Sequence, residues 1–156
     1  TGTTLRENRL KRINGGTLLQ SQACLIANKK LLLENETKLK TTKVILELME
    51  AHFESKRYVS ITANVRGKSE VEIGDRLMEE GGFHGIAGLQ GPTIAKVYAG
   101  GDSDWFAVTV VVRQDMLLSA INHLRNVGGR DMTVLSPQYV FSSKSSIYEA
   151  FLDKIK

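Results

Sequence analysis

The chain has 156 residues, a formal net charge of +4 and a single cysteine, and 42% of its residues are hydrophobic. One cysteine excludes an intrachain disulfide, a cysteine zinc ribbon and a disulfide-rich secreted scaffold. The basic residues are spread along the chain without a groove-reading element, which argues against a nucleic-acid partner. The longest apolar stretches fall well short of the ~20 residues that cross a bilayer, so we expect no membrane partner.

The first residues predict a phosphate-binding loop followed by a helix. Thr1, Gly2, Thr3 and Thr4 supply three hydroxyl groups and a glycine ahead of a pattern that predicts a helix over residues 3–13. Free N–H groups at a helix N-terminus favour an anion. The same residue types are also ordinary helix caps, so the local pattern leaves both interpretations open. Because Thr1 resembles the middle of a loop, we expect further residues to precede it.

Two apolar patterns follow this segment. The run of residues 23–27 predicts a buried strand, with Cys24 as an inert buried thiol. A polar stretch around residues 34–40 marks a candidate domain boundary. Residues 44–53 then carry an amphipathic stripe with helical spacing, which predicts a long helix.

The second half of the chain predicts a ferredoxin-like domain of the α+β class. Strands are expected over 58–65, 92–98, 105–112 and 132–135, and helices over 69–80 and 116–127. This strand, helix, strand, strand, helix, strand order places two helices on one face of an antiparallel sheet. Residues 139–141 are expected to add an edge strand, and Ser146 with Glu149 has capping-box spacing before a last helix.

Segments along nearly the whole chain resemble one family. They are TGTTLRENRLKRI, GGTLLQSQACLIANK, ANVRG, LQGPTIAKVY, DWFAVTVVV and LRNVGGRDMTVLSPQYVF. The chain resembles the C-terminal half of a long-form ATP phosphoribosyltransferase of the plant type. This resemblance implies that residues 1–56 are the C-terminal part of a periplasmic-binding-protein-like catalytic domain, with the phosphoribosyl pyrophosphate loop and a connecting helix. Residues 57–156 would form a ferredoxin-like, ACT/PII-like regulatory domain.

The resemblance implies the first step of histidine biosynthesis, in which ATP and phosphoribosyl pyrophosphate form phosphoribosyl-ATP and pyrophosphate. Mg²⁺ would accompany the pyrophosphate group. Thr1, Gly2, Thr3, Thr4 and Leu5 would hold the 5-phosphate. No residue of the chain is assigned a catalytic or metal-binding role, and positioning with charge stabilisation can suffice when a good leaving group departs. The ATP pocket would lie upstream of Thr1, so we expect the chain alone to be inactive.

The resemblance also implies feedback inhibition by histidine, which would bind between subunits of a homo-oligomer, a dimer or hexamer. Its motifs place Asn64, Leu89, Thr93, Val111 and Asp131 near that pocket. Asn64 stands where some members carry an acid, so an ion pair with the ligand would become a neutral hydrogen bond. The plant-type likeness points to the plastid stroma, with the cytoplasm as the alternative. Two competing hypotheses are a stand-alone small-molecule sensor and an oligomerisation module.

Other conspicuous residues have simpler interpretations. His52, His84 and His123 fall on three different predicted elements without metal-ligand spacing, which favours surface or packing roles. Trp105 begins an apolar strand and is expected to be a core or interface aromatic. Arg66, Lys68 and Lys96 are expected to be solvated charges.

Overall fold

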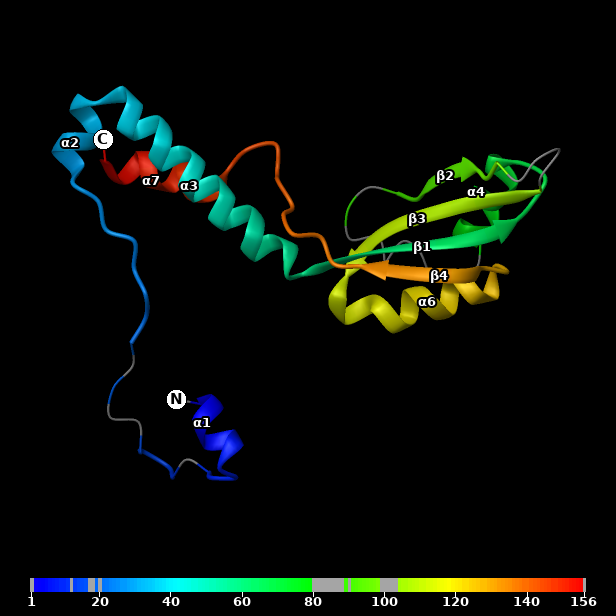
Figure 1. The fold of residues 1–156 in the computed structure, drawn as a ribbon, viewed down its shortest axis with the longest axis horizontal. Coiled ribbons are helices and arrows are strands. Elements are labelled where there is room, and N and C mark those ends of the chain that lie inside the picture. The colour runs from blue at the N-terminus through cyan, green and yellow to red at the C-terminus, as the bar shows by residue number, and fades with distance from the viewer. Residues whose placement is uncertain are drawn as a thin grey trace.

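The structure is a computed structural model that describes residues 2–11, 13–16, 19, 21–79, 89, 91–98 and 104–155. The helices are α1 (Gly2–Glu7), α2 (Lys29–Glu34), α3 (Glu36–Ser55), α4 (Glu70–Glu79), α6 (Leu117–Asn126) and α7 (Ser146–Ile155), with the 3₁₀ turn η1 (Gln114–Met116). The strands are β1 (Tyr58–Arg66), β2 (Thr93–Lys96), β3 (Trp105–Arg113) and β4 (Arg130–Leu135). In Figure 1, α2, α3 and α7 lie side by side at one end, the sheet lies at the other end, and α1 lies apart from both.

The four strands form one antiparallel sheet in the order β2-β3-β1-β4. With α4 between β1 and β2 and α6 between β3 and β4, the connectivity is the predicted ferredoxin-like order, which is confirmed. We call the unit from β1 to β4 the sheet domain. The central strands β1 and β3 pair along their full nine-residue length, from Tyr58 with Arg113 to Arg66 with Trp105.

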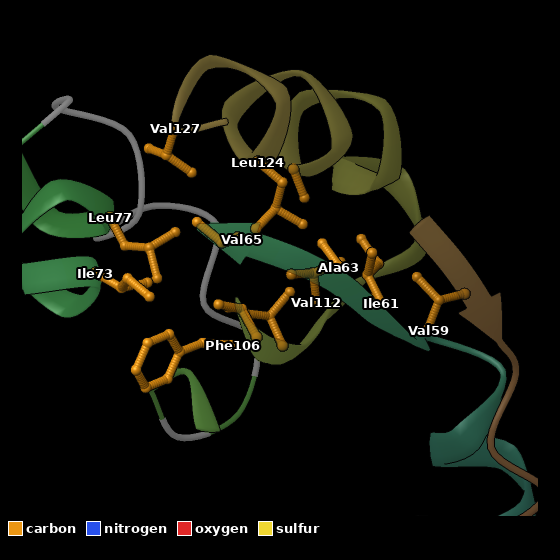
Figure 2. Close-up of a cluster of buried hydrophobic side chains, with 13 residues drawn as sticks. Val59, Ile61, Ala63, Val65, Ile73, Leu77, Phe106, Val112, Leu124 and Val127 are labelled. Atoms are coloured by element: carbon orange, nitrogen blue, oxygen red, sulfur yellow. The ribbon is translucent and has the colours of Figure 1, made fainter. Parts of the chain in front are cut away.

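The core lies between one face of the sheet and the helices α4 and α6. Both central strands alternate strictly between buried and half-buried positions, as the two-residue period of a strand requires. Their buried members meet apolar side chains from the two helices, as Figure 2 shows for the labelled residues of β1, α4 and α6. The cluster comprises Val59, Ile61, Ala63, Val65, Ile73, Leu77, Phe106, Val108, Val110, Val112, Ala120, Leu124 and Val127.

Local signals place the ends of the core helices. The hydroxyl of Ser69 accepts a hydrogen bond from the Glu72 N–H (3.2 Å), which caps the N-terminus of α4. The Glu72 carboxylate in turn accepts from the Lys68 N–H (2.6 Å). Helix α6 ends at Asn126, and Gly128 turns the chain after it with a φ of +90° that glycine adopts without strain.

His123 lies on α6 and is buried, and its Nε2 is 2.9 Å from the Leu77 carbonyl oxygen of α4. This contact joins the two core helices, so the packing role expected for His123 is confirmed. His52, in contrast, is exposed on α3, with its ring tilted against Tyr139. His84 lies outside the described residues. Among the residues that the structure does describe, no group of three potential metal ligands occurs.

Three expectations for irregular regions are wrong. Residues 21–28 form no strand, and Leu25 and Ile26 are 60% and 90% exposed, because no described strand lies beside them to pair their backbone groups. Cys24 is accordingly exposed and not buried. Residues 139–141 form no edge strand, since the Val140 N–H donates to the Ala51 carbonyl oxygen of α3 (3.0 Å) instead of to the sheet.

A carboxylate on α3 holds the start of α7. Glu50 accepts hydrogen bonds from the Ser145 hydroxyl, the Ser146 N–H (3.1 Å) and the Ser146 hydroxyl (2.5 Å). These bonds, led by that of Ser145, lower the pKa of Glu50 below its ordinary value. Ser145 caps α7 by accepting from the Tyr148 N–H (3.1 Å), so the capping residue is Ser145 and the prediction of Ser146 was one position late.

The contacts of α7 with α3 bring the end of the chain back beside residues that precede the sheet domain. The division into 1–56 and 57–156 stays a prediction. Within the part of the chain that the structure describes, no helix is long and apolar enough to cross a membrane.

We predict that Leu124→Ala lowers the free energy of unfolding by about 2–5 kcal/mol, because Leu124 is fully buried and its loss leaves a cavity. Leu118→Ala is the matched control, since Leu118 lies on the same helix but is 74% exposed. Urea unfolding of both variants measures the difference. Equal losses would contradict the assigned core.

We predict that Glu50→Gln destabilises the α3–α7 contact near pH 7 and makes the stability less dependent on acid. A lowered folded-state pKa gives stability that is present above the ordinary pKa and is lost as the pH falls through the folded value. Thermal unfolding followed by circular dichroism from about pH 7 to about pH 3 measures this. Glu47→Gln is the control, because Glu47 pairs only with Lys43 among the described residues (3.6 Å). The same acid profile in both variants would disprove the role of Glu50.

Candidate ligand-binding site on the open face of the sheet

The face of the sheet opposite α4 and α6 is covered by no described element (Figure 1). The half-buried positions of β1 and β3 point to this open face, because their neighbours along each strand point into the core. On β1 and β3 the positions of the open face are mostly small or polar, and they include Ser60, Thr62, Asn64, Ala107 and Thr109. An exposed sheet face of this composition offers hydroxyl and amide groups to a ligand or to another subunit.

A row of threonines crosses all four strands on the open face. Thr93 of β2 is opposite Thr109 of β3, which is opposite Thr62 of β1, which is opposite Thr133 of β4. The Thr62 and Thr109 hydroxyl oxygens are 2.9 Å apart and share a hydrogen bond. Sequence inspection singled out only Thr93. The other three threonines could have been found from the two-residue spacing of small polar residues in strands that are otherwise aliphatic.

The structure brings three of the five predicted histidine contacts to the open face. Asn64 and Val111 are half-buried positions of the central strands, and Thr93 begins β2. Val111 is the cross-strand partner of Ser60, and this pair is next to the threonine row on the open face. Asn64 is the partner of Ala107, and this pair is next to the threonine row on its other side. The three residues therefore belong to three successive rows of one surface.

Asp131 lies elsewhere. Between the pairs Thr62–Thr133 and Asn64–Arg130, β4 has one more residue than β1, which forms a bulge. Asp131 sits in this bulge with a φ of +49°. It lines a pocket of about 400 Å³ together with Ile121 and Arg125 of α6, so it borders the helix side of β4 and not the open face.

Leu89 is 44% exposed, and both of its sequence neighbours lie outside the described residues. The structure therefore does not relate it to the open face. Its place in the histidine site stays a prediction.

The predicted phosphate loop has a different local structure. Helix α1 already begins at Gly2, so Thr3, Thr4 and Leu5 are helical and do not form a loop ahead of the helix. The Thr4 carbonyl oxygen accepts from the backbone and side-chain nitrogens of Asn8 (3.2 and 2.9 Å), which closes this short helix. Thr1 lies outside the described residues. The role of the segment in binding a phosphate stays a prediction.

At the end of the open face, sequence reasoning missed a contact between an arginine and the tryptophan. The Arg66 guanidinium lies over the Trp105 ring, 4.9 Å from its centroid, because these two residues are direct cross-strand partners. Arg66 is therefore an ordered cation and not merely a solvated charge. An arginine at the end of one strand and an aromatic residue at the start of its partner is the signal that identifies such a pair.

Comparison with known families gives this surface its context. Residues 55–137 match the family model described as HisG, C-terminal domain. The match begins at the last residue of α3 and ends two residues beyond β4, so it covers the whole sheet domain. The chain belongs to the HisG family. The family predicted from the sequence motifs is confirmed.

The similarity to individual HisG relatives covers more of the chain than the family match does. It is 35% identical over 158 residues to ATP phosphoribosyltransferase 2, chloroplastic, of Arabidopsis thaliana, covering 99% of the chain and 38% of the relative. It is 37% identical over 144 residues to ATP phosphoribosyltransferase 1, chloroplastic, of the same plant, covering 90% of the chain and 34% of the relative. An ATP phosphoribosyltransferase of Methanocaldococcus jannaschii is 34% identical over 86% of the chain. The chain spans 34–42% of the length of these three relatives.

Proposed function

We propose that this chain is the C-terminal part of an ATP phosphoribosyltransferase, which makes phosphoribosyl-ATP in the first step of histidine biosynthesis and is inhibited by histidine. The observation that carries the proposal is the 35% identity to a chloroplastic ATP phosphoribosyltransferase, which extends over 99% of the chain. The similarity thus includes the segment before the sheet domain as well as the family match itself.

The segment before the sheet domain is assigned to the catalytic half. Residues 1–56 would complete a periplasmic-binding-protein-like domain, and Thr1 to Leu5 would hold the 5-phosphate of phosphoribosyl pyrophosphate. ATP would bind to residues that precede Thr1 in the longer protein. Phosphate oxygens are the ligands that Mg²⁺ prefers, so the ion would arrive with the pyrophosphate group of the substrate. In this assignment the chain positions a substrate and supplies no general base.

The open face of the sheet is assigned to histidine. Asn64 and Thr93 offer an amide and a hydroxyl to the amino acid, and Val111 offers an apolar contact. The three successive rows occupied by these residues support this assignment. Leu89 and Asp131 stay predicted contacts from the family motifs, and Asp131 would have to act from the helix side of β4. A second subunit placed over the open face would enclose the ligand, which favours a homo-oligomer, a dimer or hexamer.

Chloroplastic relatives support the plastid stroma as the location of the longer protein. The cytoplasm is the alternative. The stand-alone sensor and the oligomerisation module remain the competing functions, and the two experiments that follow distinguish them from the enzyme.

We predict that the full-length protein forms phosphoribosyl-ATP from ATP, phosphoribosyl pyrophosphate and Mg²⁺, whereas the 156-residue chain does not. In the full-length protein, the double change Thr3→Val and Thr4→Val is expected to raise the KM for phosphoribosyl pyrophosphate by about tenfold, since hydroxyl bonds to a charged phosphate are lost. The absorbance of phosphoribosyl-ATP measures both the formation of product and the KM for phosphoribosyl pyrophosphate.

Thr41→Val with Thr42→Val is the matched control, because these α3 hydroxyls donate only to backbone carbonyl oxygens within their own helix. An unchanged KM in the Thr3 and Thr4 variant would contradict the phosphate assignment. Histidine binding by a full-length protein that neither binds phosphoribosyl pyrophosphate nor turns it over would instead establish the sensor.

We predict that Thr93→Val and Asn64→Ala each weaken histidine binding to the full-length protein by about tenfold, as expected for the loss of one hydrogen bond in a ligand site. Asn64→Asp is expected to strengthen binding, because a carboxylate pairs with the ligand ammonium. Isothermal titration with histidine measures the affinities. Thr41→Val on the remote helix α3 is the control. Equal affinities in all four variants would refute the assignment of the open face.

A further inference from the structure

Three arginines converge at one end of the sheet domain. A pocket of about 260 Å³ is lined by Arg66, Arg76, Trp105, Gly128 and Arg130. Arg66 ends β1 and Arg130 begins β4, while Arg76 comes from the last turn of α4. Residues from several separate elements therefore meet in one small cavity, which we call the arginine pocket. None of the described residues that line it carries a carboxylate.

Two of the three guanidinium groups are held in place. Arg66 is stacked on Trp105, and an Arg76 Nη2 donates to the Arg66 carbonyl oxygen (2.5 Å). Gly67 allows this approach, because a Cβ at this position would come within 3.3 Å of the Arg76 Nη2 and within 2.6 Å of Ile73. The cations are thus positioned by the fold before any ligand arrives, which reduces the entropy cost of binding.

The charges of the pocket are poorly neutralised. The Arg76 Nε is buried without a hydrogen-bond partner, and the nearest ion-pair oxygen, from Glu72, is 3.9 Å away. Within the described residues, no ion pair involves Arg66 or Arg130. Other arginines of the chain do have close partners, as Arg113 has in Asp115. Like charges held together without counterions indicate a site for an anion.

The described acidic residues near the arginine pocket leave most of its positive charge uncompensated. Glu79 lines the adjoining pocket that Arg76 and Gly128 share, and Asp131 follows Arg130 but lines the pocket beside α6. Glu72 partly offsets Arg76 alone. Among the described residues, Arg66 and Arg130 therefore have no carboxylate in an ion pair with them.

We propose that the arginine pocket binds a phosphate-bearing small molecule, a phosphate monoester or a diphosphate, at a site separate from that of histidine. A phosphate carries a charge of about −1.5 to −2 and several acceptor oxygens, which match two or three guanidinium forks better than the single charge of a carboxylate does. None of the five residues proposed for histidine lines the pocket. The proposal does not depend on the catalytic assignment.

The pocket nevertheless adjoins the open face. Arg66 follows Asn64 by two residues on β1, and Arg130 is the cross-strand partner of Asn64 on β4. A bound phosphate compound would therefore lie beside the residue assigned to histidine.

Trp105 provides a direct readout, because it is the only tryptophan of the chain and lines the pocket. The experiment titrates the 156-residue chain with inorganic pyrophosphate at constant ionic strength, follows tryptophan fluorescence, and repeats the titration by calorimetry. We expect saturable binding that Arg130→Gln weakens by about tenfold or more, with a smaller loss for Arg130→Lys, which keeps the charge but not the fork. Circular dichroism verifies that each variant is folded.

The controls separate this site from other sources of anion binding. Arg113→Gln removes an arginine at the opposite end of β3 and is expected to leave the affinity unchanged. Thr3→Val with Thr4→Val tests whether pyrophosphate binds instead near α1, and acetate tests whether any carboxylate suffices. No saturable binding, equal weakening by Arg113→Gln, loss only in the Thr3 and Thr4 variant, or equal affinity for acetate would each overturn the proposal.

Discussion

The antiparallel pairing of β1 with β3 is the constraint on which the rest of the structure depends. Nine consecutive residues of each strand are in register, and alternate members of both are buried beneath α4 and α6. Because side chains alternate between the faces of a strand, a shift by one residue would expose the entire aliphatic set and bury the polar one. The burial of Ile61, Val65, Val108 and Val112 therefore also determines which residues remain on the open face.

The same pairing places both candidate sites on one unit. Its middle rows present Asn64, Thr109 and Val111 on the open face, and its last pair stacks Arg66 on Trp105 at the edge of the arginine pocket. A core built on one side of a sheet leaves the other side available for ligands or subunits without a cost to the core. This separation of packing from binding is compatible with the regulatory role proposed for the sheet domain, because the recognition surface can change while the fold is retained.

Polar contacts connect the segment that follows the sheet domain to helix α3, which precedes it. Glu50 binds Ser145 and Ser146 at the start of α7, and the Ser55 hydroxyl donates to the Gln138 carbonyl oxygen (3.0 Å) as the chain leaves the sheet domain. These bonds hold the segment after β4 against α3 (Figure 1). Apolar residues of α3 such as Val44 and Phe53 nevertheless remain exposed, 53% and 62%.

The sequence by itself determined the elements of the sheet domain and their order, because two-residue and helical periodicities are local signals. The family was predicted separately, from the resemblance of its motifs, and the family match confirms it. The family resemblance predicted Asn64, Thr93 and Val111 as histidine contacts, and the register places these three residues on one face. Only the tertiary structure decided that residues 21–28 lack a strand partner, that Asp131 lies in a bulge beside α6, and that Arg66, Arg76 and Arg130 share a pocket. These features depend on contacts between residues far apart in the chain, for which no local pattern exists.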